Sequence, residues 1–187
     1  MTENELVSFI KKCQRENSDS GILLPDKNTI KIALNLLVNT SNNDIKILLL
    51  FDDNGKNSPL FDLIDNDVFI NNSISLLKDE NINFQIASNK VKTIRKSKFF
   101  KSLSENFNIN NRCKVRAIND YVISEMKKKK LNNEFVITNS NTLIFGDFSL
   151  RIDFKPYLNF NEKSFSKTLN SFFDMALEFN KENELER

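Results

Sequence analysis

The fold of this chain is decided by Asn132-Asn133-Glu134-Phe135-Val136-Ile137-Thr138-Asn139 and the following Leu143-Ile144-Phe145-Gly146-Asp147-Phe148-Ser149-Leu150. Each stretch contains a short apolar run of the length of a β-strand, at residues 135–138 and 143–145. The polar residues 139–141 between them are typical of a tight turn. We therefore expect two adjacent strands, with Gly146 close to the end of the sheet.

Similar patterns lie on both sides of this pair. Residues 45–51 form a continuous apolar run flanked by turn residues, which is typical of a strand buried on both faces. Further strands are expected at residues 82–87, 113–118 and 150–154. Helices are expected at about residues 3–16, 28–38, 58–78 (one broken helix or two short ones), 98–107, 119–130 and from 161 onward. The expected N-caps are Thr2 (in a capping box with Glu5), Ser58 (before Pro59), Asn119 and Asn161.

Helices that alternate with short apolar strands indicate the α/β class. We expect a mostly parallel central sheet with flanking helices, and strand pairs near the C-terminus. Neither an internal repeat nor a low-complexity linker interrupts the pattern, so residues 1–187 are interpreted as one domain with a charged tail from about residue 180.

Composition limits the classes of protein and of site. The chain has 187 residues, 40% of them apolar and 28% charged, which suits a soluble domain with a substantial core. No apolar run approaches 18 residues, and residues 1–15 do not resemble a signal peptide, so the prediction is a cytoplasmic protein without a membrane partner. Cys13 and Cys113 are expected to be small buried hydrophobic residues. With no histidine in the chain, we predict neither a metal site nor a cofactor.

Positive charge is concentrated in residues 90–130. This segment holds 13 basic and 3 acidic residues (net +10), and the rest holds 14 basic and 22 acidic residues (net −8). Such a block predicts an anionic partner, and phosphates are the first expectation. The predicted phosphate- or partner-binding residues are Lys92, Arg95, Lys96, Lys98, Arg112, Lys114, Arg116, Lys127 and Lys128. An acidic protein, or the chain's own acidic flanks, would explain the block equally well.

The two stretches quoted first resemble the signature of the phospholipase D superfamily, His-x-Lys-x-x-x-x-Asp followed by an apolar strand ending in Gly-Ser-x-Asn. The resemblance places the family's His, Lys and Asp on Asn132, Glu134 and Asn139. Its Gly falls on Gly146, and its Ser and Asn fall on Asp147 and Ser149. The spacing, the strands and the glycine are kept, whereas every catalytic side chain differs. The resemblance covers about residues 28–178 and implies a phospholipase D-like domain that often pairs with a second copy.

The altered residues predict a site without catalysis. The family's nucleophile is an imidazole, which this chain does not contain. Glu134 and Asp147 place negative charge where the family binds a phosphoryl group, which would repel the substrate. We therefore expect a non-catalytic, phospholipase D-like binding or accessory subunit that contacts nucleic-acid phosphates.

Two other functions stay open. One is a protein-interaction subunit or homodimerising scaffold of a larger assembly. The other is a metal-dependent nuclease, because Asp147, Asp153 and Lys155 superficially resemble the carboxylate and lysine arrangement of restriction-type nucleases. An amphipathic strand with a charged outer face explains Asp153 and Lys155 better.

Overall fold

A computed structural model of the chain describes residues 2–42, 44–52, 54, 58–107, 112–129, 133–138, 141–150 and 155–178. Seven described strands form one sheet in the order β1-β7-β6-β5-β2-β3-β4. They are β1 (Ile22–Leu23), β2 (Ile45–Leu49), β3 (Phe84–Ser88), β4 (Cys113–Ala117), β5 (Glu134–Thr138), β6 (Leu143–Gly146) and β7 (Tyr157–Asn159). The helices are α1 (Glu3–Arg15), α2 (Lys27–Thr40), α3 (Pro59–Ile64), α4 (Asp67–Leu76), α5 (Val91–Arg95), α6 (Lys98–Asn106), α8 (Asp120–Lys128) and α9 (Lys163–Glu178).

The α/β class is confirmed, but the expectation of a mostly parallel sheet is wrong. Only the pairs β2–β3 and β3–β4 are parallel. The four remaining pairs, including the one between β2 and β5, are antiparallel. The sheet therefore has a parallel part and a larger antiparallel part, which meet between β2 and β5.

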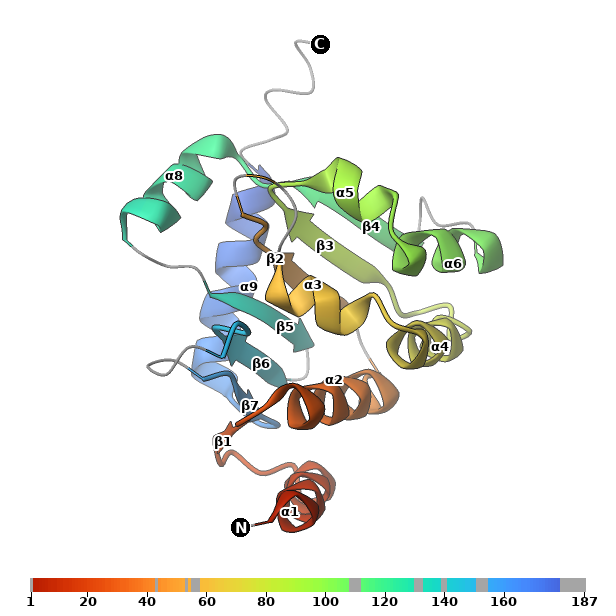
Figure 1. The fold of residues 1–187 in the computed structure, drawn as a ribbon, viewed down its shortest axis with the longest axis vertical. Helices are drawn as coiled ribbons and strands as arrows, with labels where there is room; N and C mark the ends of the chain where they lie inside the picture. The colour runs from red at the N-terminus through yellow and green to blue at the C-terminus, as the bar shows by residue number, and fades with distance from the viewer. Residues whose placement is uncertain are drawn as a thin grey trace.

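Helices lie on both faces of the sheet (Figure 1). One face carries α1 to α6, and its core includes Ile45, Ile47, Phe84 and Ile86. The other face carries α8 and α9, whose Val122, Met126, Leu169 and Phe173 pack on Leu48, Ala87 and Phe135. The alternation of side chains along each strand explains this division, because neighbouring residues point to opposite faces.

Most expected helix starts are confirmed. Thr2 and Glu5 form a capping box, Ser58 caps α3 with Pro59 in its first turn, and Asn119 caps α8. Helix α9 begins one residue later than expected. The amides of Ser164 and Phe165 donate to Oε1 of Glu162, rather than to the expected Asn161.

A strand was expected at residues 150–154, but its first residue, Leu150, is not part of a strand. Leu150 has a left-handed backbone with φ of 60°, and its amide donates to the carbonyl of Asp147, so it closes a turn. Residues 151–154 lie outside the described residues. The strand that follows β6 is β7, and the expected strand pair β5–β6 is confirmed.

Both cysteines are free and buried, as expected. Burial raises the pKa of the Cys113 thiol to about 12, so it stays protonated at neutral pH. None of the described helices combines the length and apolarity needed to cross a membrane.

Candidate functional site

Glu134, at the start of β5, is held inside the protein rather than presented to solvent. Its side chain is 2% exposed. The amide of Leu50 and the hydroxyl of Ser58 donate to its Oε1 at 2.9 and 2.5 Å. The amide of Leu60 donates to its Oε2 at 2.9 Å. The carboxylate thus joins β5 to the end of β2 and to the first turn of α3.

Gly146 lies directly opposite Glu134 in the β5–β6 ladder. Its φ is 148°, and a Cβ atom there would approach Cα of Pro156 to 2.6 Å. A side chain would therefore meet both backbone strain and a collision with backbone atoms. The glycine of the motif is required by the local backbone, whatever the chemistry of the site.

Of the remaining motif positions, the structure describes Asp147 and Ser149, which form a turn of their own. Asn132 and Asn139 lie outside the described residues. Asp147 accepts the amide of Ser149 at 2.8 Å within a turn, and Ser149 is exposed. Asp147 affects Glu134 only through its negative charge.

Burial raises the pKa of Glu134 from 4.5 to about 7, and the charge of Asp147 acts in the same direction. The three hydrogen bonds oppose this rise without cancelling it. Between pH 4.5 and 7 the folded protein therefore binds more protons at this site than the unfolded chain does. The contribution of Glu134 to stability is largest below pH 4.5 and is lost as the pH rises through about 7.

A pH series tests this linkage. The free energy of unfolding of the wild type, measured by urea denaturation from pH 5 to pH 8, should contain a falling component that Glu134→Gln lacks. The difference between the two proteins isolates Glu134 from the other titrating groups. Parallel curves for the two proteins would contradict the raised pKa.

Some of the described cations in residues 90–129 interact with other groups of the protein, and others are left at its surface without such a partner. Arg112 belongs to the first group, since its guanidinium donates to the carbonyls of Leu77, Asp79 and Ile82. Arg112 therefore fastens the end of α4 to the segment that enters β3. Its expected role as a ligand contact conflicts with this geometry.

Three lysines of the predicted set also have partners within the protein. Lys98 pairs with Asp67 at 2.5 Å, and Lys128 pairs with Glu125 at 2.7 Å. Lys127 also interacts with another group of the protein. The Lys98–Asp67 pair is well exposed on both sides, so it stabilises the fold little and can exchange for another anion.

Five cations form what we call the β4 basic rim: Lys92, Arg95, Lys96, Lys114 and Arg116. All five are exposed, and within the described part of the chain no carboxylate forms an ion pair with them. Strand β4 lies at one edge of the sheet, and α5 packs on it.

The rim borders both faces of this edge. Cys113 and Val115 point into the core beneath α5, so Lys114 and Arg116 must point to the α9 side. Ile94 anchors α5 on the first face and leaves Lys92 and Arg95 exposed there.

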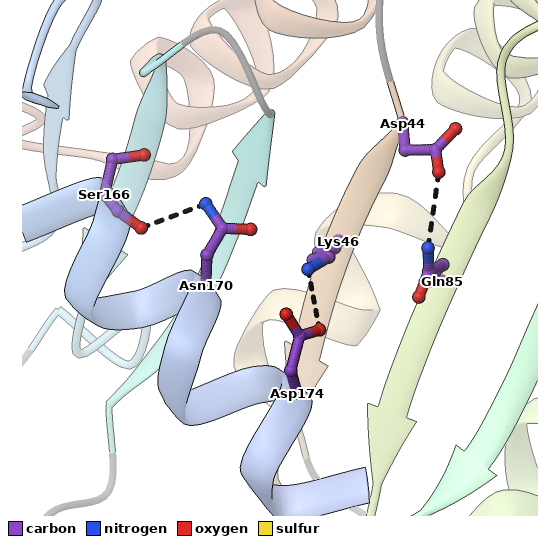
Figure 2. Close-up of polar contacts among 6 residues, drawn as sticks. All are labelled: Asp44, Lys46, Gln85, Ser166, Asn170 and Asp174. Atoms are coloured by element: carbon purple, nitrogen blue, oxygen red, sulfur yellow. Dashed lines mark hydrogen bonds and ion pairs between the residues drawn. The ribbon is translucent and has the colours of Figure 1, made fainter. Parts of the chain in front are cut away.

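A further cation on the α9 face is already neutralised. Lys46 on β2 lies in register with Gln85 and, through it, with Lys114. Figure 2 shows its ammonium beside Asp174 of α9. The ion pair measures 2.7 Å, and the ammonium also lies 5.4 Å from the centre of the Phe173 ring. Asp44 accepts from Gln85 at 3.3 Å in the same view. Lys46 therefore helps to hold α9 on the sheet and is not part of the rim.

The sequence did not reveal the donors that surround Glu134. The Ser58-Pro59 pair signalled a helix start, but nothing in it indicated a contact with a residue 76 positions away. The Lys46–Asp174 pair spans 128 positions and was missed for the same reason. Asp153, which the nuclease hypothesis needs, lies outside the described residues, within which no group of acidic or cysteine side chains could hold a metal.

Comparison with known proteins finds a likeness in structure but none in sequence. No protein-family model matches the chain, and no curated protein matches its sequence. Among solved structures, that of TrmBL2, an archaeal chromatin protein reported to show a novel mode of DNA binding, is similar with a TM-score of 0.52 and 10% identity. The similarity covers 94% of this chain and 59% of that chain, and at this identity it shows a shared fold alone.

Proposed function

We propose that this chain is a non-catalytic binding module that holds nucleic-acid phosphates with the β4 basic rim. The observation that carries the proposal is the set of five exposed cations around one sheet edge. Phosphates bind to surfaces of this kind by displacing condensed counterions, without reading the bases. TrmBL2 binds DNA, which fits the proposal, although the likeness to it concerns only the fold.

The proposed absence of catalysis rests on Glu134. Its carboxylate is occupied by three donors of the protein itself and is shielded from solvent. We therefore propose that Glu134 is a structural group rather than a nucleophile or an acid–base catalyst. We propose that the chain has a phospholipase D-like domain whose motif now serves the fold. The β5–β6 pair and the position of Gly146 support this kinship.

A protein partner is the competing explanation for the same surface. Charged side chains on an edge strand also prevent sheets from joining edge to edge, and this role needs no ligand. Removing the cations distinguishes the two explanations. Only the binding of nucleic-acid phosphates predicts that a variant without these cations loses affinity for nucleic acid.

The proposal is tested with the double variant Lys114→Ala/Arg116→Ala. Its affinity for a labelled oligonucleotide, measured by fluorescence anisotropy over a range of salt, should fall at all sequences about equally. The slope of log affinity against log salt should become shallower by roughly 1.8 on duplex DNA or roughly 1.4 on a single strand, for two lost contacts.

The matched control is Lys27→Ala/Lys31→Ala, which removes two exposed cations from α2. It has the same net charge as the test variant, so it should retain the affinity and the slope of the wild type. Equal losses in both variants would mean that overall charge, rather than the rim, attracts the ligand. A wild type that binds no nucleic acid at low salt would remove the proposed function.

A further inference from the structure

Within the described ranges, Tyr121 is the most exposed of the large apolar side chains, at 68%. It lies in the first turn of α8, where Val122 and Met126 are the residues that pack into the core. Its ring and its hydroxyl make no contact with another ring or hydrogen-bonding group among the described residues. The cap bond of this turn uses only its backbone, since the amide donates to Asn119. The fold therefore does not require an aromatic side chain at this position.

Tyr121 follows the β4 basic rim closely along the chain. Ile118 directly follows β4 and its amide donates to the carbonyl of Ser88, and α8 begins two residues later. Arg116 and Tyr121 are five positions apart in the chain, so their Cα atoms are at most roughly 18 Å apart. That span is comparable to the length of a few nucleotides. The turn also holds Asp120, whose charge suits the start of a helix.

Aromatic rings beside cations recognise nucleic acids in a particular form. Bases of a single strand can leave their stack and lie on a ring, while the cations follow the phosphates. Bases inside a duplex are already stacked and paired, so an external ring has no base face to contact. Phe9, the other exposed aromatic residue in the described ranges, lies on α1 at the opposite end of the molecule (Figure 1).

We propose that the ligand of the β4 basic rim is a single-stranded nucleic acid, with one base stacked on Tyr121. This inference rests on the proposed function and adds the form of the nucleic acid. It requires a preference for single strands over duplexes that depends on the ring of Tyr121 and not on its hydroxyl.

The composition of the chain allows a direct test. It has two tyrosines and no tryptophan, and Tyr157 packs against Phe145 and Phe165. In a Tyr157→Phe background, tyrosine fluorescence therefore reports on Tyr121 alone. Titration with a single-stranded oligo(dT) of about 12 nucleotides should quench this fluorescence, whereas a duplex of the same length should not.

Affinities measured with the same two probes separate the two proposals. Tyr121→Ala should bind oligo(dT) about 5- to 150-fold more weakly and the duplex as the wild type does, while Tyr121→Phe should match the wild type on both. Unchanged oligo(dT) binding by Tyr121→Ala would overturn the stacking inference. The phosphate proposal would then still stand if Lys114→Ala/Arg116→Ala lost affinity. A wild type that binds neither probe would overturn both proposals in favour of a protein partner.

Discussion

Glu134→Lys is expected to lower the free energy of unfolding by at least about 4 kcal/mol. The substitution restores the residue type of the phospholipase D signature, but it places an ammonium group among three hydrogen-bond donors. The amides of Leu50 and Leu60 and the hydroxyl of Ser58 would lose their acceptor in a site that water does not reach. In thermal denaturation the melting temperature of the variant should be about 8 to 16 °C lower than that of the wild type.

The matched control is Glu80→Lys, the same charge change at an exposed position. It should alter the free energy of unfolding by no more than about 0.5 kcal/mol. Glu134→Gln should fall between the two, because its amide keeps one acceptor oxygen and turns a donor toward the amide of Leu60. A Glu134→Lys protein as stable as the wild type would show that the three contacts are not important to the fold.

Arg112→Ala is expected to destabilise the protein by about 2 to 3 kcal/mol. The guanidinium is a charged donor to three backbone carbonyls, those of Leu77, Asp79 and Ile82. Without it, the junction between α4 and β3 loses the group that satisfies these carbonyls. Chemical denaturation measures the loss directly.

Lys114→Ala, two residues further on, is the control and should leave stability within about 0.5 kcal/mol of the wild type. Arg112→Lys should recover only part of the stability, because a lysine lacks the planar fork that reaches several acceptors. If Arg112→Ala kept full stability and instead lost affinity for nucleic acid, Arg112 would belong to the ligand-binding surface after all.

The sequence predicted local structure better than the path of the chain through the sheet. The caps at Thr2, Ser58 and Asn119 depend on neighbouring residues, so a local pattern reveals them. Strand direction does not: the apolar run of β5 has the same composition whether β5 runs parallel or antiparallel to β2. Strands β1 and β7 have two and three residues and depend on distant partners. They are too short to show the alternation of apolar and polar residues that predicts a strand.

The candidate site shows the same limit. Alternation along residues 112–116 grouped Arg112 with Lys114 and Arg116, but β4 begins at Cys113 and Arg112 turns back to the α4–β3 junction. The sequence alone predicts that the charge of Glu134 does not suit the phospholipase D reaction. Its structural role depends on donors 74 to 84 positions away, which no local pattern indicates. The exposure of Tyr121 likewise follows from how α8 packs.

The central claim is that the ligand binds at the β4 basic rim and not at the phospholipase D-like motif. At 21.7 kDa the protein suits a map of backbone amide shifts by NMR during titration with oligo(dT). We predict that the amides of β4, α5 and the first turn of α8 change their chemical shifts. The amides of Leu50 and Leu60, which are hydrogen-bonded to Glu134, should keep theirs. Shifts centred on Leu50, Leu60 and Gly146, with none in β4, would contradict the account.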